Sequence, residues 1–146
     1  MKFIAKNRRA NYDYDIERTL TAGLVVSGPE AKSLRLGLVS LKGSFAHIKN
    51  GELWLFNAHI SAYPHATTNN PNEPTQVRKL LVSKRELKDL MAAKDSGRSI
   101  VPLAILGGRY VKVELGIGKG KKRFDKRQTI KQRDTKRNIE RDLSAH

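Results

Sequence analysis

The sequence predicts a mainly β protein, namely a small antiparallel β-barrel of the OB type, closed or partly open, with two or three short helices. Short segments with apolar residues at every second position recur through residues 1–118, which is typical of half-buried strands. Turns marked by glycine separate these segments. Residues 119–146 hold few apolar side chains and predict a basic C-terminal tail that is disordered when free. A split α+β sandwich is the alternative for the first part.

The first strand and the first helix are predicted within residues 19–37. Apolar residues alternate with a period of two over 19–26, which predicts a strand. A helix follows, because Ser27 and Glu30 have the spacing of a capping box. It ends at Gly37, since glycine accepts the backbone angles found just beyond a helix C-terminus.

A β-hairpin is predicted within residues 44–60. Asn50-Gly51 separates the strands 44–49 and 52–60, and both turn residues accept the positive φ that a two-residue hairpin needs. In the second strand, one alternating set of side chains is predicted to face the core. These are Trp54, Phe56, Ala58 and Ile60.

A long loop, a short strand and a second helix are expected next. Residues 61–76 are rich in Pro, Asn and Thr and show no periodicity, so we expect a mobile loop. A strand follows over 78–82. Ser83 and Glu86 again have capping-box spacing, and Gly97 ends the helix. Its predicted inward stripe is Leu87, Leu90 and Met91.

A second hairpin is predicted from residues 99–106 and 109–117 around Gly107-Gly108. The last strand is expected to break off through three alternating glycines, which lack a Cβ and let the chain turn away from the sheet. These are Gly116, Gly118 and Gly120. We therefore divide the chain into a barrel over 1–118 and a tail over 119–146.

The charge of the chain favours a polyanionic partner. The formal net charge is +15, from 29 Lys and Arg against 14 Asp and Glu. The tail holds 11 of these basic residues and 4 of the acidic ones, so both parts of the chain are basic. This distribution is typical of a nucleic-acid-binding protein. A negatively charged membrane surface is the weaker alternative, because the tail lacks the broad apolar face of an interfacial helix.

The composition also predicts a soluble, cytoplasmic protein. There is no cysteine, so neither a disulfide nor a thiolate metal site can form. Residues 1–6 are too short and too charged for a signal peptide. The longest apolar run, 100–106, contains a proline and is too short to cross a bilayer.

Motifs for catalysis are not found in the sequence. The P-loop spacing and the dinucleotide-binding fingerprint are absent. The four histidines show no metal-ligand spacing. Asp13, Asp15 and Glu17 form an acidic cluster that a magnesium-dependent nuclease could use, but no second cluster accompanies it. We therefore expect a binding protein with no enzyme activity, no metal and no cofactor.

Several short motifs occur in one order along nearly the whole chain. They are Ile4-Ala5-x-Asn7-Arg8-Arg9-Ala10, Ala22-Gly23, Glu30-x-Lys32-Ser33-Leu34-Arg35, Asn57-Ala58-His59-Ile60, Arg78-Lys79-Leu80-Leu81 and Gly118-Lys119-Gly120-Lys121-Lys122-x-Phe124-Asp125-Lys126-Arg127. In these motifs the chain resembles the small protein B family, the transfer-messenger-RNA-binding proteins of bacteria. It departs from the family pattern at Thr21, where the family usually has an acidic residue.

The resemblance implies a fold, a partner and a mechanism. An OB-type barrel would bind the tRNA-like domain of transfer-messenger RNA near its elbow and take the place of the missing anticodon stem. Protein and RNA would then enter a ribosome stalled on an mRNA without a stop codon. The tail would reach the decoding centre of the small subunit and lie as a helix in the vacant mRNA channel. The protein is expected to act as a monomer.

The resemblance and the basic positions around its motifs define two sets of candidate residues. The RNA-binding set is Asn7, Arg8, Arg9, Lys32, Arg35, Arg78, Lys79, Leu81, Lys119, Gly120, Lys121 and Lys122. The ribosome-binding set is Phe124, Asp125, Lys126, Arg127, Lys131, Arg133, Lys136 and Arg137. Phe124 would stack on a base of the decoding centre, and Asp125-Lys126-Arg127 matches a triplet that accommodation requires.

Two other functions compete with this interpretation. A ribosomal protein whose basic tail threads through rRNA would have the same composition. It would sediment with all ribosomes, whereas a rescue factor would be found with stalled ones and with one RNA. A nuclease that uses Asp13, Asp15 and Glu17 would degrade RNA in magnesium buffer.

Overall fold

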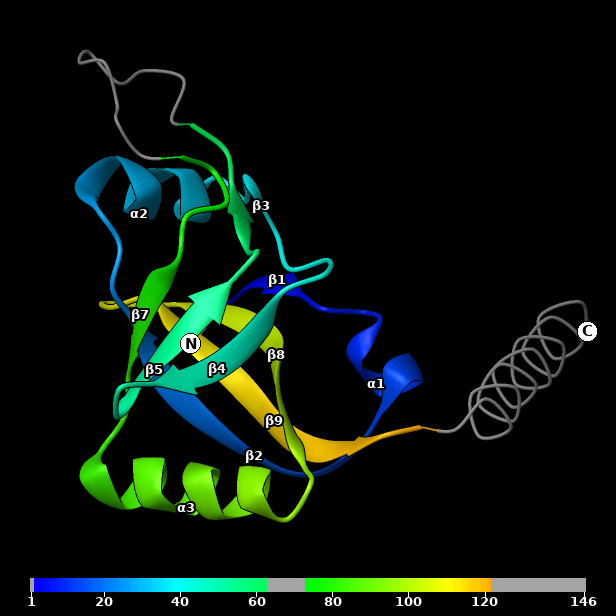
Figure 1. Ribbon diagram of the computed structural model, residues 1–146. Coiled ribbons are helices and arrows are strands. Elements are labelled where there is room, and N and C mark those ends of the chain that lie inside the picture. Colours follow the sequence, from blue (N-terminus) through cyan, green and yellow to red (C-terminus); the bar gives the residue numbers. More distant parts are fainter. Residues whose placement is uncertain (1, 63–72, 122–146) are drawn as a thin grey trace, which may run out of the picture.

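The structure is a computed structural model that describes residues 2–62 and 73–121 (Figure 1). Its helices are α1 (Ala10–Asp13), α2 (Gly28–Arg35) and α3 (Lys84–Asp95). Its strands are β1 (Lys2–Lys6), β2 (Tyr14–Leu24), β3 (Val39–Ser40), β4 (Phe45–Lys49), β5 (Glu52–Phe56), β6 (His59–Ile60), β7 (Arg78–Leu81), β8 (Ser99–Gly107) and β9 (Lys112–Gly120). The expectation of a mainly β fold is confirmed. Most of the predicted loop 61–76 and the tail beyond Lys121 lie outside the described residues.

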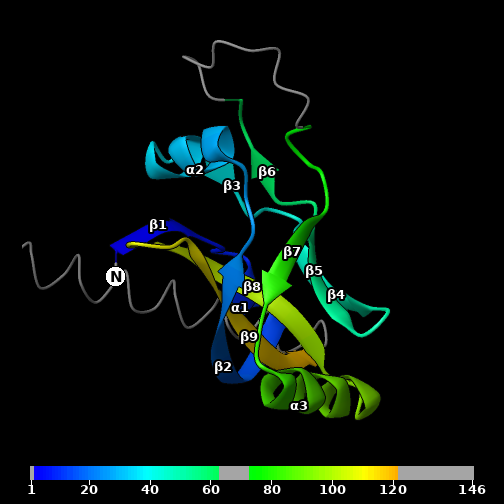
Figure 2. The ribbon, with the colours of Figure 1, turned by 90° about the vertical axis from the view of Figure 1, so that its left-hand side faces the viewer.

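Seven strands form one antiparallel sheet in the order β1-β8-β9-β2-β7-β5-β4, and β3 pairs with β6 in a second, two-stranded sheet. The large sheet is strongly curved, and its edge strand β4 comes back to contact β8 (Figures 1 and 2). The two edge strands β1 and β4 do not pair with each other. The described strands therefore form a curled, open sheet rather than a closed barrel.

The core fills the concave side of this sheet. Leu53, Leu80 and Leu115 from three different strands are almost fully buried in one apolar cluster. Helix α2 lies at one end of the sheet and α3 at the other (Figure 1). Leu34 of α2 and Leu90 of α3 have no exposed surface, so each helix covers one end of the core. Burial of such side chains stabilises the fold by about 2 kcal/mol each.

The predicted helix ends and the first hairpin turn are confirmed. Ser27 with Glu30, and Ser83 with Glu86, each form a complete capping box. Gly37 and Gly97 follow α2 and α3 with φ angles of 77° and 87°. The hairpin turn between β4 and β5 has positive φ at both central residues, Asn50 and Gly51. These local signals are reliable because each one satisfies backbone groups that a helix end or tight turn would otherwise leave unpaired.

The face of β5 that points into the core was predicted wrongly. Leu53 and Leu55 are buried, whereas Trp54 and Phe56 lie on the outer face and are only half-buried. Asn57 has a φ of 60°, which interrupts the alternation directly after β5. Ala58 and Ile60 are therefore buried as expected, although the two aromatic residues before them are not.

The predicted inward stripe of α3 is also partly wrong. Leu90 and Ala93 are buried and Leu87 packs at the edge of the core, whereas Met91 is 45% exposed. The helix contacts the end of the sheet along a single line of residues three apart. Met91 lies one position beyond this line and so points toward solvent.

The glycines at the end of the last strand continue the sheet instead of ending it. β9 stays paired with β2 as far as Gly120, which lies opposite Tyr14. At Gly118 a Cβ atom would lie 2.0 Å from the Asp15 carbonyl oxygen, so the two backbones pack closer than any side chain permits. The prediction that the strand breaks off here was wrong because glycine also serves the close approach of two strands.

Within the part of the chain that the structure describes, no helix combines the length and the apolar character needed to span a membrane.

We predict that Gly118→Ala destabilises the protein by at least about 2 kcal/mol, because the added Cβ must push β2 away from β9. Gly120→Ala is the matched control, since nothing lies within 4 Å of a Cβ at that position. It should change the free energy of unfolding by less than about 0.5 kcal/mol. Urea unfolding of the two variants measures both values. Equal stability of the two variants would show that the close contact at Gly118 is unimportant.

Candidate nucleic-acid interface

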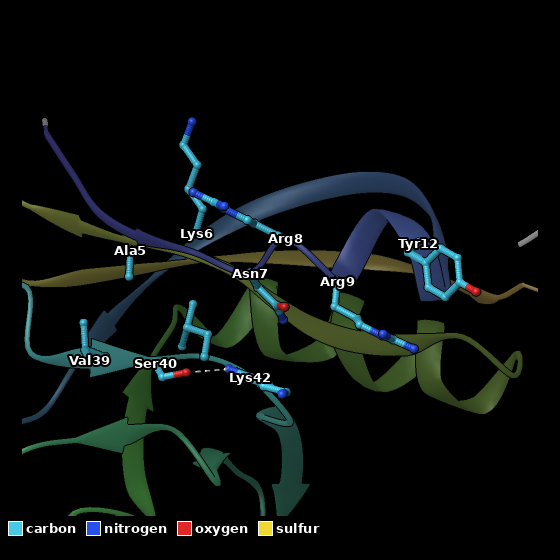
Figure 3. A pocket seen from close by; sticks show the side chains of 10 residues that line it. Ala5, Lys6, Asn7, Arg8, Arg9, Tyr12, Val39, Ser40 and Lys42 are labelled. Atoms are coloured by element: carbon cyan, nitrogen blue, oxygen red, sulfur yellow. Dashed lines mark hydrogen bonds between the residues drawn. The ribbon is translucent and has the colours of Figure 1, made fainter. Parts of the chain in front are cut away.

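A basic groove of about 570 Å³ lies between the N-terminal segment and the stretch after α2 (Figure 3). Residues 5–9 and Tyr12 line one side of it, and residues 39–42 line the other. Figure 3 shows Asn7 and Arg9 extending toward the side of Val39–Lys42. Arg9 and Lys42 are both exposed, so the groove brings together cations from two segments more than thirty residues apart.

Asn7 holds the N-terminal segment in place. Its backbone N–H donates to the Leu103 carbonyl at 2.7 Å, and its side-chain amide donates to the Pro102 carbonyl at 2.8 Å. Both carbonyls belong to β8. These bonds direct the chain from β1 into α1, and so they position Arg8 and Arg9 at the surface.

The end of β9 lies against α1, next to this groove. The Lys121 backbone N–H donates to the Asp13 carbonyl at 2.8 Å, and its Nζ donates to the Asn11 carbonyl at 2.7 Å. Lys119 and Gly120, which precede it, are exposed. The structure thus brings the predicted residues 119–121 and Arg8–Arg9 to neighbouring segments, although they are far apart in the sequence.

Helix α2 presents Lys32 and Arg35 at the surface. Both side chains are exposed, whereas Ser33 and Leu34 between them are buried. Burial of this opposite face fixes the orientation of the helix, because a helix rotated about its axis would expose Leu34. The predicted pair of cations is therefore held at an accessible surface.

Strand β7 presents Lys79 and Leu81 on the convex side of the sheet. Lys79 forms a salt bridge of 3.0 Å with Glu52 on the adjacent strand. Leu81 is 53% exposed and lies opposite Gly23 of β2. A Cβ at Gly23 would lie 3.4 Å from the Leu81 Cβ, so the glycine leaves one side of this leucine open.

Arg78 was predicted to bind RNA, but the structure places its side chain in the interior rather than at the surface. Its side chain is 2% exposed and forms an ion pair with Glu30, whose side chain is 6% exposed. The guanidinium also donates to the backbone carbonyls of Ala58, Gln76 and Pro74. A buried arginine requires such partners because an unpaired charge in the core is very costly. Arg78 therefore supports the interface from within.

The Glu30 carboxylate accepts hydrogen bonds from two elements at the same time, the cap of α2 and strand β7. One oxygen accepts the Ser27 N–H at 3.1 Å and completes the helix cap, while the other accepts the Arg78 Nε–H at 2.7 Å. Burial alone would raise the pKa of the Glu30 carboxyl. The hydrogen bonds from Ser27 and Arg78 outweigh this effect and hold the pKa below its ordinary value.

The three acidic residues of the nuclease alternative do not assemble into a metal site. The Glu17 carboxylate accepts a 2.7 Å hydrogen bond from Arg98, which holds the pKa of Glu17 below its ordinary value. An Asp13 carboxylate oxygen lies 3.5 Å from Nε of Arg9. Asp15 lies opposite Lys119 in the register of β2 and β9. No cluster of three metal-binding side chains occurs within residues 2–62 and 73–121.

Two features of the basic surface were missed in the sequence. Lys6 and Lys42 flank the groove, but Lys6 occupies the unassigned position of the first motif and Lys42 lies outside every motif. Only the fold, which places the turn after β3 beside the N-terminal segment, identifies them. Several predicted residues lie outside the described part of the chain. These are Lys122, Phe124, Asp125, Lys126, Arg127, Lys131, Arg133, Lys136 and Arg137.

A curved antiparallel sheet with exposed cations on its N-terminal turn, on α2 and at the end of β9 defines a class of small nucleic-acid-binding proteins. Comparison with known proteins identifies the family within this class. The family model described as SmpB protein matches residues 4–145, and the chain therefore belongs to the SmpB family. This family consists of non-enzymatic RNA-binding proteins, which confirms the expectation of a binding protein.

Individual relatives agree with this assignment. The chain is 48% identical over 146 residues to the SsrA-binding protein of Carboxydothermus hydrogenoformans, covering 99% of this chain and 97% of that protein. It is 47% identical over 142 residues to the SsrA-binding protein of Shouchella clausii, covering 96% and 90%. A solved structure described as "tmRNA-SmpB: a journey to the center of the bacterial ribosome" is 40% identical, with a TM-score of 0.67 over 86% of this chain and 93% of that one.

We predict that Glu30→Gln makes the protein less acid-sensitive while destabilising it at neutral pH. The folded-state pKa of Glu30 is below its ordinary value of 4.5, so the ionised form contributes stability above that pH and loses it as the pH falls further. At pH 7 the variant leaves the Arg78 charge unpaired and should lose about 3 kcal/mol. Below the ordinary pKa, its free energy of unfolding should fall less steeply than that of the parent.

Unfolding curves from pH 7 down to acid conditions measure this difference. Glu52→Gln is the control, because it breaks the exposed salt bridge to Lys79 and should cost less than about 1 kcal/mol. Parallel pH profiles for the parent chain and the Glu30 variant would contradict the role of this carboxylate.

Proposed function

We propose that this chain binds the tRNA-like domain of transfer-messenger RNA and delivers that RNA to stalled ribosomes for trans-translation. The observation that carries the proposal is the match of one family over residues 4–145, together with relatives that are SsrA-binding proteins over nearly their whole length. The likeness to a solved tmRNA-SmpB structure supports the same partner and the ribosome. The surface of exposed cations around Arg8, Arg9, Lys32, Arg35 and Lys119 suits such a partner.

The body of the chain, in this proposal, binds the RNA and replaces its missing anticodon stem. The curled sheet is a variant of the OB type, a fold that binds oligonucleotides. Asn7 and Arg78 act from within by positioning the cations around them. The protein works as a monomer in the cytoplasm, where both RNA and ribosomes are found.

The part of the chain beyond Lys121 performs the second step of the proposed function. It enters the decoding centre, where Phe124 stacks on a base and Asp125-Lys126-Arg127 takes part in accommodation. Lys131, Arg133, Lys136 and Arg137 contact the walls of the vacant mRNA channel, which are lined with phosphates. Translation then resumes on the reading frame of the transfer-messenger RNA.

We predict that replacing both Lys32 and Arg35 by Ala weakens binding of transfer-messenger RNA and flattens its salt dependence. For each phosphate contact that is lost, RNA binding releases about one counterion fewer. The slope of log K against log salt should therefore change by about 1 to 2. Filter binding over a range of salt concentrations measures it. Replacement of Lys84 and Arg85 is the matched control, since it removes two exposed charges from α3 at the opposite end of the sheet (Figure 1). Equal changes in both variants would mean that α2 makes no specific contact.

We predict that a chain ending at Lys121 still binds transfer-messenger RNA but no longer supports rescue. Lys121 keeps its bonds to Asn11 and Asp13 in that variant, so the described interface stays complete. RNA affinity and addition of the peptide tag in a reconstituted translation system are measured side by side. If RNA affinity and tag addition fell by the same factor, the result would contradict the claim that the body binds RNA and the remainder of the chain supports rescue.

A further inference from the structure

Four side chains with aromatic rings lie on the outer face of the β4–β5 hairpin, so they do not belong to the core. Alternation along the two strands buries Ala46, Leu53 and Leu55 on the inner face. The outer positions of the two strands therefore carry rings at four successive sites. These are Phe45, His47, Trp54 and Phe56.

The rings are arranged as neighbouring pairs. Phe45 lies directly opposite Phe56, and their rings stack at 5.1 Å between centroids with 4° between planes. His47 lies opposite Trp54, and its ring meets that of Phe56 edge to face with 6.3 Å between the ring centroids. Phe45 remains 45% exposed in spite of this stacking. A cross-strand aromatic pair stabilises a hairpin, but stability alone does not require so large an exposed ring.

Cations surround this cluster of rings on the convex face of the sheet. Lys49 is exposed on the same side of β4, and Lys79 lies opposite Trp54 on β7. Lys94 reaches over from α3 and contacts Nδ1 of His47. Glu52 is the carboxylate among the outer positions of these strands, and it is paired with Lys79. The local charge is thus positive around an aromatic centre.

We propose that this outer face of the β4–β5 hairpin is a second RNA-binding site, which takes unpaired nucleotides by stacking their bases on Phe45 and its neighbours. Every base has an aromatic face, so stacking on a protein ring does not depend on the RNA sequence. The lysines then lie where the phosphates of the same strand would pass. The site shares Lys79 with the set proposed for the tRNA-like domain but differs in its stacked rings, which that set does not contain.

Unpaired nucleotides fit this face better than a duplex does. In a double helix the base faces are covered by their neighbours, and only edges, sugars and phosphates are accessible. The flat pair of Phe45 and Phe56 has no donor or acceptor that could contact base edges. β4 is one of the two edge strands of the large sheet, so the rings lie at the border of its convex face, where a single strand of RNA can reach them (Figure 2).

The test uses Trp54, the single tryptophan of the chain, as a reporter inside the proposed site. The full-length protein is titrated with a single-stranded oligouridylate and with an RNA duplex of equal length, and the tryptophan fluorescence is recorded. We expect saturable quenching by the single strand and little change with the duplex. Quenching of equal size with both RNAs would overturn the proposal, because it would then reflect charge alone.

Two variants separate the ring from the bulk of the side chain. Phe45→Tyr keeps the ring and should bind the single strand like the parent. Phe45→Leu keeps apolar bulk but removes the ring, and should weaken binding at least about fivefold, which corresponds to about 1 kcal/mol. Equal affinity of the two variants would also overturn the proposal. Binding of both to transfer-messenger RNA is measured in parallel, so that failure of the proposed main function is detected separately.

Photo-crosslinking needs no variant and so does not depend on their folding. A single strand that contains 5-bromouracil is irradiated with the parent protein, and the crosslinked peptide is identified by mass spectrometry. Crosslinks at Phe45 or His47 are expected. Crosslinks confined to other segments would exclude this face as a binding site.

Discussion

The buried ion pair between Glu30 and Arg78 is the interaction on which the α2 and β7 parts of the basic surface depend. It joins the cap of α2 to β7 and, through the Arg78 guanidinium, to carbonyls of residues 58, 74 and 76. Lys32 and Arg35 project from α2, while Lys79 and Leu81 project from β7. Two charges are expensive to bury, and removing one partner of such a pair costs about 3 to 5 kcal/mol. The cost is offset here because the carboxylate and the guanidinium are both supplied with hydrogen bonds.

In α2 and β5, apolar side chains on one face are buried in the core and thereby hold the opposite face at the surface. α2 buries Leu34 and exposes its cations, and β5 buries Leu53 and Leu55 while Trp54 and Phe56 point outward. Asn7 and Gly118 serve in another way, since they fix how closely the N-terminal segment and β2 approach β8 and β9. RNA binding by this fold therefore needs no catalytic geometry. It needs cations and rings that stay in place when the polyanion arrives.

Much of the fold could be predicted from the sequence because local signals decide it. The two capping boxes, the Asn50-Gly51 turn and the glycines after α2 and α3 each act within a few residues. The errors arise where distant contacts decide. Such contacts also bury Arg78, whose partner Glu30 lies 48 positions away in the sequence. The outward face of Trp54 depends on the left-handed backbone at Asn57, and the role of Gly118 depends on the carbonyl of Asp15. The position of Lys42 beside the groove likewise depends on the topology, which places the turn after β3 next to the N-terminal segment.

The central claim is that the chain recognises one RNA rather than polyanions in general. Its most direct test is to recover a tagged copy of the full chain from cells and to sequence the RNA that remains bound through a high-salt wash. Contacts to phosphates alone weaken steeply with salt, so the wash removes RNA that is held by charge only. If transfer-messenger RNA dominates the recovered pool, the recognition claimed for the body of the chain is correct. Recovery of bulk ribosomal RNA, or of no particular RNA, would contradict it.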